Sequence, residues 1–222
     1  MKLLIFPGGG SPDDKRYAKV YGLLSVRAKD FGYSSVDISI RWPGQILKTG
    51  FAGDVLTFQG ALDVAVAKLA ETEQEGEPYD LLARSFGTCV ALKAVTVINA
   101  VHIRRIVLWG AAPLWVFWEL FVRDLNHYKS IAHEKGLLVD ESFFSTLEPL
   151  ESLLKQTTHK VIVASGTDDK YSTPAFLAYL YQDVKGRGKY IEFRPPVKGA
   201  PHEVDAELPI EVVEDYLNCV LS

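Results

Sequence analysis

Short runs of aliphatic and β-branched residues alternate along the whole chain with longer segments that have helical periodicity. An alternation of this kind predicts a parallel sheet with helices packed on both of its faces. We therefore expect an α/β fold with a doubly wound, mostly parallel six-stranded sheet. The six runs are Leu3 to Phe6, Val36 to Ile40, Asp80 to Ala83, Ile106 to Trp109, Lys160 to Ala164 and Tyr190 to Phe193.

Residue types that begin or end helices lie between these runs. Asp13 and Asp14 are expected to begin the first helix and Gly32 to end it, because short polar residues cap helix N-termini and glycine often follows the last turn. Residues 209–221 form the last expected helix. Apolar side chains recur on one of its faces, which we expect to pack on the sheet: Ile210, Val213, Leu217 and Val220.

One interval breaks the alternation of strands and helices. About fifty residues without a convincing strand pattern separate Gly110 from Lys160, whereas connections in α/β units usually have about 2–6 residues. We therefore expect residues 113–158 to form a helical cap insertion over the binding pocket. Trp115 and Trp118 are expected either to line that pocket as an apolar wall or to fill core.

The bulk properties limit the number of domains and the kinds of partner. With 222 residues, 48% of them hydrophobic, and no linker-like segment, the chain is expected to form one domain over residues 1–222. The formal net charge is −4 and basic residues do not cluster among aromatic ones, which argues against nucleic acid as a partner. The longest apolar stretch, residues 106–118, is shorter than the ~20 residues of a membrane-spanning helix.

Signals for export, disulfides and metal binding are also missing from the sequence. Residues 1–6 are too short for the apolar part of a secretory signal and run into glycines, so a cytoplasmic location is expected. Two cysteines, Cys89 and Cys219, are too few for a disulfide framework. No Cys-x-x-Cys or His-Glu-x-x-His spacing occurs, so no metal is expected. The pattern leaves the oligomeric state open.

Four segments that carry polar residues or glycines follow directly after predicted strands. In open parallel sheets, ligands bind beyond the carboxyl ends of the strands. A glycine loop, a serine, an acid and a histidine are therefore expected to meet at one edge of the sheet. The segments are Pro7 to Gly10, Arg84 to Gly87, Gly166 to Asp169 and Gly199 to His202.

Ser85 is flanked two positions to either side by small residues, Ala83 and Gly87. A strand that turns at once into a helix leaves no room for larger side chains there and holds the serine hydroxyl out into the cleft. This pattern resembles the nucleophile elbow of the α/β-hydrolase family, whose usual form is Gly-x-Ser-x-Gly, with Ala83 in the first glycine position. Taken alone, the segment also fits an ordinary serine N-cap without chemistry.

The resemblance to α/β-hydrolases covers nearly the whole chain. Family members order their triad along the chain as serine, acid and histidine, and Ser85, Asp169 and His202 follow that order. The segment VDISIRWPGQ, residues 36–45, is similar to the family's fourth strand. The family's two leading strands have no counterpart here, so the resemblance implies the sheet order 2-1-3-4-5-6 for the six runs.

The resemblance implies a serine hydrolase that cleaves a carboxylic ester or related acyl bond of a small molecule and needs no cofactor. Ser85 is then the nucleophile, His202 the general base, and Asp169 the acid that orients the imidazole and stabilises its cation. Asp168 is the alternative acid. Asp169 is preferred because the family's acid usually falls three residues after the glycine that ends this strand, here Gly166.

The glycine loop after the first strand is the expected oxyanion hole. Residues 7–9, Pro-Gly-Gly, resemble the His-Gly-x loop of many family members, with proline in place of the histidine. The backbone N–H groups of Gly9 and Phe86 are then the donors to the oxyanion. A flexible strand-to-helix turn is the ordinary alternative.

Two other classes of function compete with a hydrolase. A hydrolase-like domain that has lost activity and acts as a binding module is consistent with Ala83 and with the missing leading strands. A dinucleotide site is suggested by the spacing Gly8-x-Gly10-x-x-Asp13 and by Asp37 as a ribose ligand. That spacing lacks the third glycine and places a carboxylate near the pyrophosphate position.

Two residues beside Ser85 allow simpler expectations. Arg84 is expected to pair with a nearby Asp or Glu or, alternatively, with a carboxylate of the substrate. Cys89 lies four residues after Ser85 on the same helix and is expected to be buried beneath the elbow as a small apolar group.

Overall fold

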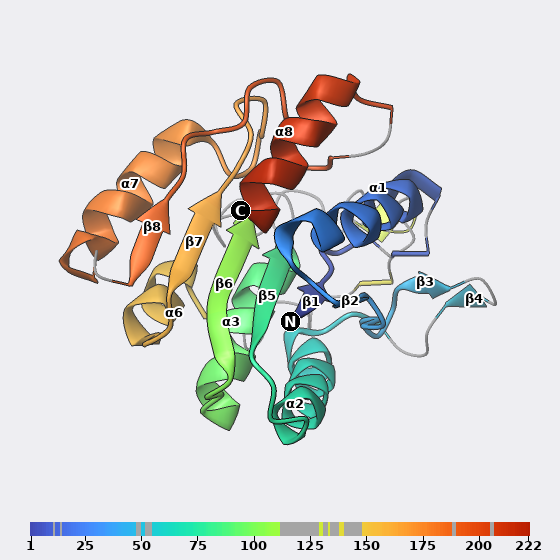
Figure 1. Cartoon of the computed structure of the whole chain (residues 1–222), viewed down its shortest axis with the longest axis vertical. Helices are drawn as coiled ribbons and strands as arrows, with labels where there is room; N and C mark the ends of the chain where they lie inside the picture. Colours follow the sequence, from blue (N-terminus) through green and yellow to red (C-terminus); the bar gives the residue numbers. More distant parts are fainter. Residues whose placement is uncertain are drawn as a thin grey trace.

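Six parallel strands form the main sheet of the protein (Figure 1). The sheet order is β2-β1-β5-β6-β7-β8, which confirms the predicted order of the six runs. The strands are β1 Lys2–Phe6, β2 Ser35–Asp37, β5 Tyr79–Arg84, β6 Ile103–Trp109, β7 Val161–Ala164 and β8 Ile191–Phe193. The computed structural model describes residues 1–10, 12–13, 15–47, 50–51, 55–111, 129–130, 133, 138–139, 148–187, 190–204 and 207–222.

The register of the sheet aligns the carboxyl ends of its central strands. Arg84, the last residue of β5, lies opposite Trp109 of β6, and Trp109 lies opposite Ala164 of β7. On the other side of β5, Phe6 of β1 lies opposite Ala83. The loops that follow these strands therefore begin side by side at one edge of the sheet.

Strand β2 is shorter than the run that predicted it. The run reaches Ile40, but the strand ends at Asp37 because the Asp37 carboxylate accepts hydrogen bonds from the N–H and hydroxyl of Ser39. An aspartate that bonds its own backbone two residues on turns the chain. Beyond this turn, β3 (Ile46–Leu47) and β4 (Gly50–Phe51) form a separate antiparallel pair that the sequence did not predict.

Helices cover both faces of the sheet, as predicted for a doubly wound fold. Helices α1 and α8 pack on one face, and α2, α3, α6 and α7 contribute to the core on the other face (Figure 1). The helices are α1 Lys15–Arg27, η1 Ala28–Phe31, α2 Phe58–Gln74, α3 Phe86–Ile98, α6 Leu150–Gln156, α7 Pro174–Val184, η3 Lys185–Arg187 and α8 Ile210–Leu221.

The ends of the first and last helices test the expectations for them. The first helical segment continues through η1 and ends at Gly32, as predicted. In α8, the predicted face is buried at Val213, Leu217 and Val220. The prediction for Ile210 is wrong, since this side chain is 65% exposed. Ile210 is the first residue of α8, and the first turn of this helix lies beyond the carboxyl ends of the strands (Figure 1).

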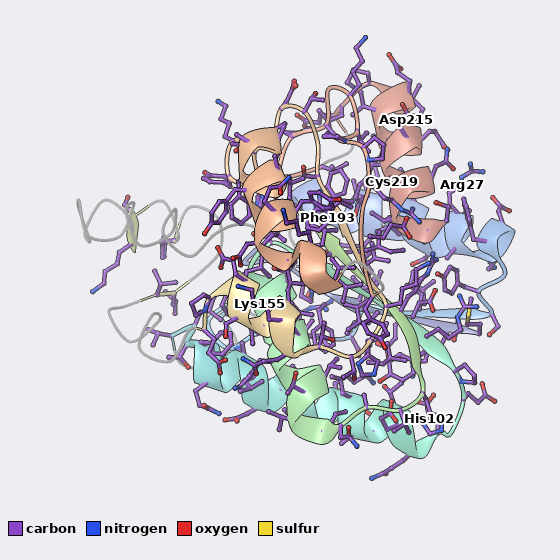
Figure 2. All side chains as sticks on the ribbon, turned by 90° about the vertical axis from the view of Figure 1, so that its left-hand side faces the viewer. Arg27, His102, Lys155, Phe193, Asp215 and Cys219 are labelled. Atoms are coloured by element: carbon purple, nitrogen blue, oxygen red, sulfur yellow. The ribbon has the colours of Figure 1, made fainter. Side chains whose placement is uncertain are left out.

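A buried polar network fixes the opposite, amino end of the sheet. The Asp80 carboxylate on β5 is fully buried and accepts hydrogen bonds from the Tyr33 hydroxyl (2.6 Å) and from the Nε atoms of Arg104 (2.9 Å) and Arg105 (2.7 Å). Figure 2 shows His102 at this same end of the molecule, next to the start of β6. The network joins two central strands far from the edge where the loops meet.

The predicted cap, residues 113–158, lies largely outside the described residues, and so do both Trp115 and Trp118. Helix α6, in the last part of that range, buries three leucines in the main core. The cap and its pocket wall stay predictions. Within the described part of the chain, no helix combines the length and apolar character needed to cross a membrane.

Candidate active site

Ser85 lies at the sharp turn between β5, which ends at Arg84, and α3, which begins at Phe86. Its backbone has φ 48° and ψ −123°, a conformation that non-glycine residues rarely adopt. Among the described residues, Asn99 is the other non-glycine residue with a positive φ. The Ser85 N–H donates to the Trp109 carbonyl at 2.9 Å, which anchors the strained turn to the neighbouring strand.

Close backbone approach explains the small residues around Ser85. A Cβ atom on Gly87 would lie 2.3 Å from the Pro7 carbonyl oxygen, so this position accepts no side chain. Ala83 is fully buried in the core, and its methyl group is accommodated where the family pattern has glycine. The replacement at Ala83 therefore leaves the turn intact.

Ser85, His202 and Asp169 are connected in series by hydrogen bonds. The Ser85 Oγ lies 2.7 Å from the His202 Nε2, and the His202 Nδ1 lies 2.9 Å from Asp169 Oδ2 and 3.1 Å from Oδ1. An ionised carboxylate only accepts hydrogen bonds, so the proton of a neutral His202 is on Nδ1. The Nε2 lone pair then faces the serine hydroxyl.

The Asp169 carboxylate is held by more than the imidazole. It is 2% exposed, and its Oδ1 also accepts hydrogen bonds from the N–H groups of Tyr171 (2.8 Å) and Ser172 (2.7 Å). Burial raises the pKa of the Asp169 carboxyl, but the interaction with His202 and these two N–H groups outweighs it and holds the pKa below its usual value. The carboxylate therefore stays ionised beside the imidazole.

The structure separates the two candidate acids. The Asp168 side chain is exposed and accepts a hydrogen bond from the Thr167 hydroxyl at 2.8 Å. The carboxylate in contact with His202 belongs to Asp169. The two loops meet closely because a Cβ atom on Gly166 would lie 1.7 Å from the Ala200 carbonyl oxygen.

The glycine loop faces Ser85 and is held from behind by a buried glutamine. The Gln45 Nε2, on a fully buried side chain, donates toward the carbonyls of Gly8 (3.1 Å), Gly9 (2.8 Å) and Gly10 (3.2 Å). The N–H of Gly9 belongs to the same planar trans peptide as the Gly8 carbonyl and points the opposite way. The loop thus directs that N–H away from Gln45.

Trp42 completes the support of this loop. Its indole N–H lies 3.1 Å from both the Pro7 and Gly8 carbonyls, and its own backbone N–H donates to Gln45 Oε1 at 2.8 Å. The sequence pattern did not identify Trp42 and Gln45 as site residues, although both lie in residues 36–45. A polar glutamine directly after a Trp-Pro-Gly turn was the available signal, but nothing in the pattern marked it as buried.

Around Ser85 the surface forms a recess with an empty volume of about 340 Å³, including the space open to solvent. The glycine loop at residues 8–10 forms one wall and His202 another. Tyr17, Tyr21, Arg84 and Glu203 complete the lining.

The residues that suggested a dinucleotide site have structural partners. The Asp37 carboxylate forms an ion pair with Lys68 at 2.9 Å and accepts the hydrogen bonds from Ser39. Asp13 pairs with Arg41 through two bonds of 3.0 Å. Both carboxylates are thus engaged with side chains of the protein.

Cys89 does not contact Ser85, His202 or Asp169 through any of the hydrogen bonds described above. Cys89 is buried beneath the elbow, as expected, and burial raises the pKa of its thiol to about 12. Within the described ranges, no group of three or more His, Cys, Asp or Glu side chains could hold a metal ion.

The sheet order, the elbow and the Ser-His-Asp series at the carboxyl edge together define the α/β-hydrolase fold. Solved structures with this fold superpose on nearly the whole chain. A monoacylglycerol lipase from Paleococcus ferrophilus is 16% identical with a TM-score of 0.65, and the match covers 99% of this chain and 93% of the lipase. A carboxylesterase structure from Nitrososphaera gargenis is 15% identical with a TM-score of 0.63, covering 98% and 88%.

An esterase from Rhodococcus sp. is also similar, at 15% identity and a TM-score of 0.63, with 99% of this chain and 91% of the esterase covered. No protein-family model matches the sequence, and no curated protein resembles it closely enough to count as a match. The likeness therefore lies in the fold.

Proposed function

We propose that the protein is a serine hydrolase that cleaves a carboxylic ester or related acyl bond of a small molecule. The observation that carries this proposal is the 2.7 Å contact between Ser85 Oγ and the His202 Nε2, whose ring is held on its other side by Asp169. Esterases and a lipase among the structural neighbours support hydrolase chemistry in general.

In the proposed reaction, Ser85 Oγ attacks the substrate carbonyl carbon while His202 Nε2 takes the hydroxyl proton. The carbonyl π electrons move to oxygen, and the resulting oxyanion accepts hydrogen bonds from the backbone N–H groups of Gly9 and Phe86. Collapse of this intermediate expels the leaving group, which receives the proton from His202. An acyl-enzyme on Ser85 remains.

Water completes the cycle by the same steps. His202 takes a proton from the water as it attacks the acyl carbon, and returns it to Ser85 Oγ when the acid product departs. Asp169 stays ionised throughout and stabilises the imidazolium cation that forms in each half of the reaction. The low pKa of Asp169 agrees with this role.

Trp115 and Trp118 are proposed to form an apolar wall for the acyl chain. An inactive binding module would not need a strained serine in contact with an oriented imidazole. The complete series of contacts therefore favours an enzyme over that alternative.

Labelling with a fluorophosphonate probe tests the proposal. We expect the wild-type protein to be labelled stoichiometrically and to hydrolyse p-nitrophenyl esters of graded chain length, and Ser85→Ala to do neither. Ser85→Ala removes the nucleophile without adding volume. A folded wild-type protein that is neither labelled nor active on any ester would overturn the proposal.

A further inference from the structure

Arg84, the residue directly before Ser85, is a buried cation. Its side chain is 5% exposed, and its guanidinium carbon lies 5.5 Å from the ring centroid of Tyr21 on α1 and 5.7 Å from that of Tyr216 on α8. Arginine stays protonated at every physiological pH. The ring faces stabilise this charge partly, but burial still removes it from water.

No protein carboxylate neutralises this charge within the described part of the chain. Among the described residues, the groups that act most strongly on the Arg84 guanidinium are the tyrosines Tyr216, Tyr21 and Tyr17, with Tyr21 also a side-chain hydrogen-bond partner, and the Arg84 Nε is buried without a hydrogen-bond partner. The expected pairing of Arg84 with a nearby Asp or Glu is therefore wrong for these residues. Buried charges in proteins are normally paired, so Arg84 calls for a partner of another kind.

A second buried arginine shows that this fold pairs such residues elsewhere. Arg105, 9% exposed, donates to the Asp80 carboxylate at 2.7 Å, and to the Tyr33 hydroxyl and the Leu221 carbonyl at 2.9 and 2.7 Å. Arg105 lies toward the amino end of the sheet, whereas Arg84 lies at the carboxyl end, beside the serine. Arg84, which has no carboxylate partner among the residues that the structure describes, is thus the one that can meet a ligand.

The position of Arg84 connects it to the reaction centre. Its side chain lines the same recess as Ser85 and His202, together with Tyr17 and Tyr21 of α1 and with Glu203. Because Ser85 and Arg84 line the same recess, a compact substrate with its carbonyl carbon at Ser85 Oγ can extend toward Arg84. The recess is small, so the group that reaches Arg84 must be compact.

We propose that Arg84 binds a carboxylate of the substrate and that this enzyme prefers short acyl compounds with a free carboxylate near the scissile bond, such as half-esters of dicarboxylic acids. This inference rests on the proposed role of Ser85. The planar guanidinium fork matches a carboxylate with two parallel hydrogen bonds, and the substrate charge would neutralise the buried cation. Arg84 is then a specificity-determining residue.

Paired substrates test the inference. The p-nitrophenyl monoesters of succinic and glutaric acid are compared with p-nitrophenyl butyrate and pentanoate, after subtraction of the uncatalysed rates. We expect wild-type kcat/KM to be at least tenfold higher for the anionic ester of each pair, as charge-assisted hydrogen bonds predict. Arg84→Gln should lower this ratio about 10–100-fold, and Arg84→Lys should lower it less because the charge remains.

Arg27→Gln is the matched control. Arg27 ends α1 and pairs with Glu214 of α8 at 2.9 Å, so the variant removes one positive charge from between the same two helices but outside the recess. Figure 2 shows Arg27 on the outside of the molecule beside α8. The wild-type ratio should persist in Arg27→Gln, and a loss equal to that of Arg84→Gln would overturn the assignment to Arg84.

A binding measurement separates this inference from the proposed function. We expect glutarate to raise the melting temperature of Ser85→Ala, but not of Ser85→Ala/Arg84→Gln. If the wild type is labelled at Ser85 and hydrolyses neutral esters with no preference for anionic ones, the Arg84 inference fails and the hydrolase stands. If neither labelling nor hydrolysis occurs, the proposed function fails. Should Arg84→Gln not fold, the wild-type ratio and the glutarate shift decide the matter.

Discussion

At the scale of single residues, Ser85 has a strained backbone conformation that places its hydroxyl against His202. A non-glycine residue with φ 48° stores about 1–3 kcal/mol of strain. The bond from its N–H to the Trp109 carbonyl, and those from the N–H and hydroxyl of Thr88 to its own carbonyl, hold the turn in place. In this conformation the hydroxyl reaches His202, so the strained backbone belongs to the residue that we propose reacts.

The adjacent aspartates offer a direct test of the triad. We expect Asp169→Asn to lower kcat about 10⁴-fold, because an amide in place of the carboxylate favours the wrong imidazole tautomer and cannot stabilise its cation. Asp168→Asn should leave kcat within about twofold, since an exposed side chain away from the imidazole contributes little. Steady-state hydrolysis of one p-nitrophenyl ester by both variants measures the difference. A larger loss in Asp168→Asn would contradict the assignment of the acid.

Substitution of Gln45 tests whether this side chain positions the glycine loop. We expect Gln45→Leu to lower kcat about 10–100-fold, less than the 10²–10³-fold of a lost oxyanion donor, because the Gly9 N–H is displaced rather than removed. KM should change less than kcat. Three carbonyls lose their buried donor, so the free energy of unfolding should fall by about 1–3 kcal/mol.

Gln59→Leu, at an exposed position on α2, is the control for this change. It should alter neither kcat nor stability noticeably. An unchanged kcat in a folded Gln45→Leu protein would show that the glutamine does not position the loop.

At the scale of elements, the proposed active site depends on how closely the loop after β7 and the loop after β8 approach each other. We expect Gly166→Ala to lower both kcat and the melting temperature, because the new Cβ would lie 1.7 Å from the Ala200 carbonyl and must push the His202 loop away from Asp169. Ester hydrolysis and thermal unfolding measure the two effects.

Gly22→Ala is the control for Gly166→Ala, because it adds the same methyl group at a position with free space. Gly22 lies within α1, where a Cβ would have no neighbour within 4 Å. Alanine is a better helix former, so this variant should raise the free energy of unfolding by about 0.5–1 kcal/mol and keep full activity. If Gly166→Ala behaves like Gly22→Ala, the close approach of the two loops is not essential.

The parallel arrangement of the strands and the convergence of Ser85, Asp169 and His202 could be predicted because both follow from local patterns, whereas the order of the strands was predicted from the resemblance to α/β-hydrolases. Runs separated by helical segments determine a parallel order, and parallel strands place their following loops at one edge. The end of β2 could not be predicted, since it depends on the side chain of Asp37 bonding to Ser39. The burial of Gln45 depends on contacts with a loop more than thirty residues away in the chain. The hydrophobic periodicity of a segment carries no information about such contacts.

The exposure of Ile210 and the lack of a carboxylate partner for Arg84 among the described residues could not be predicted for the same reason. Helical periodicity places Ile210 on the apolar face of α8 but does not tell how far the sheet extends beneath it. The local sequence indicates only that Arg84 ends a strand. Whether a carboxylate contacts it depends on the positions of α1, α8 and the loops together. Periodicity therefore predicts elements, whereas long-range contacts decide individual polar residues.

At the scale of the whole molecule, ion pairs between elements make stability depend on pH. Asp37 at the end of β2 pairs with Lys68 of α2, and Lys2 of β1 lies 3.6 Å away. Burial raises the pKa of Asp37, but the hydrogen bonds from Ser39 and the interaction with Lys68 outweigh it and lower the pKa to about 2. Asp80 and Asp169 also have lowered pKa values.

A carboxylate whose pKa is lower in the folded than in the unfolded protein stabilises the fold when it is ionised in both states. This contribution is present above the unfolded pKa of about 4 and is lost as the pH falls through the folded pKa. For Asp37 the shift from 3.8 to about 2 corresponds to about 2 kcal/mol at neutral pH. We expect Asp37→Asn to lower the free energy of unfolding by about that amount at pH 7, and the deficit to shrink steadily from about pH 4 down to pH 2.

Urea unfolding of wild type and Asp37→Asn across that range measures the difference, with Asp63→Asn on the exposed face of α2 as the control. Comparing the two proteins at each pH cancels the contributions of Asp80 and Asp169, which both retain. A deficit that stays constant between pH 7 and pH 2 would show that Asp37 acts through its shape and hydrogen bonds rather than through its charge. If the free energies of unfolding of wild type and Asp37→Asn instead converge at acid pH, the ionised carboxylate is responsible for the coupling of β1, β2 and α2.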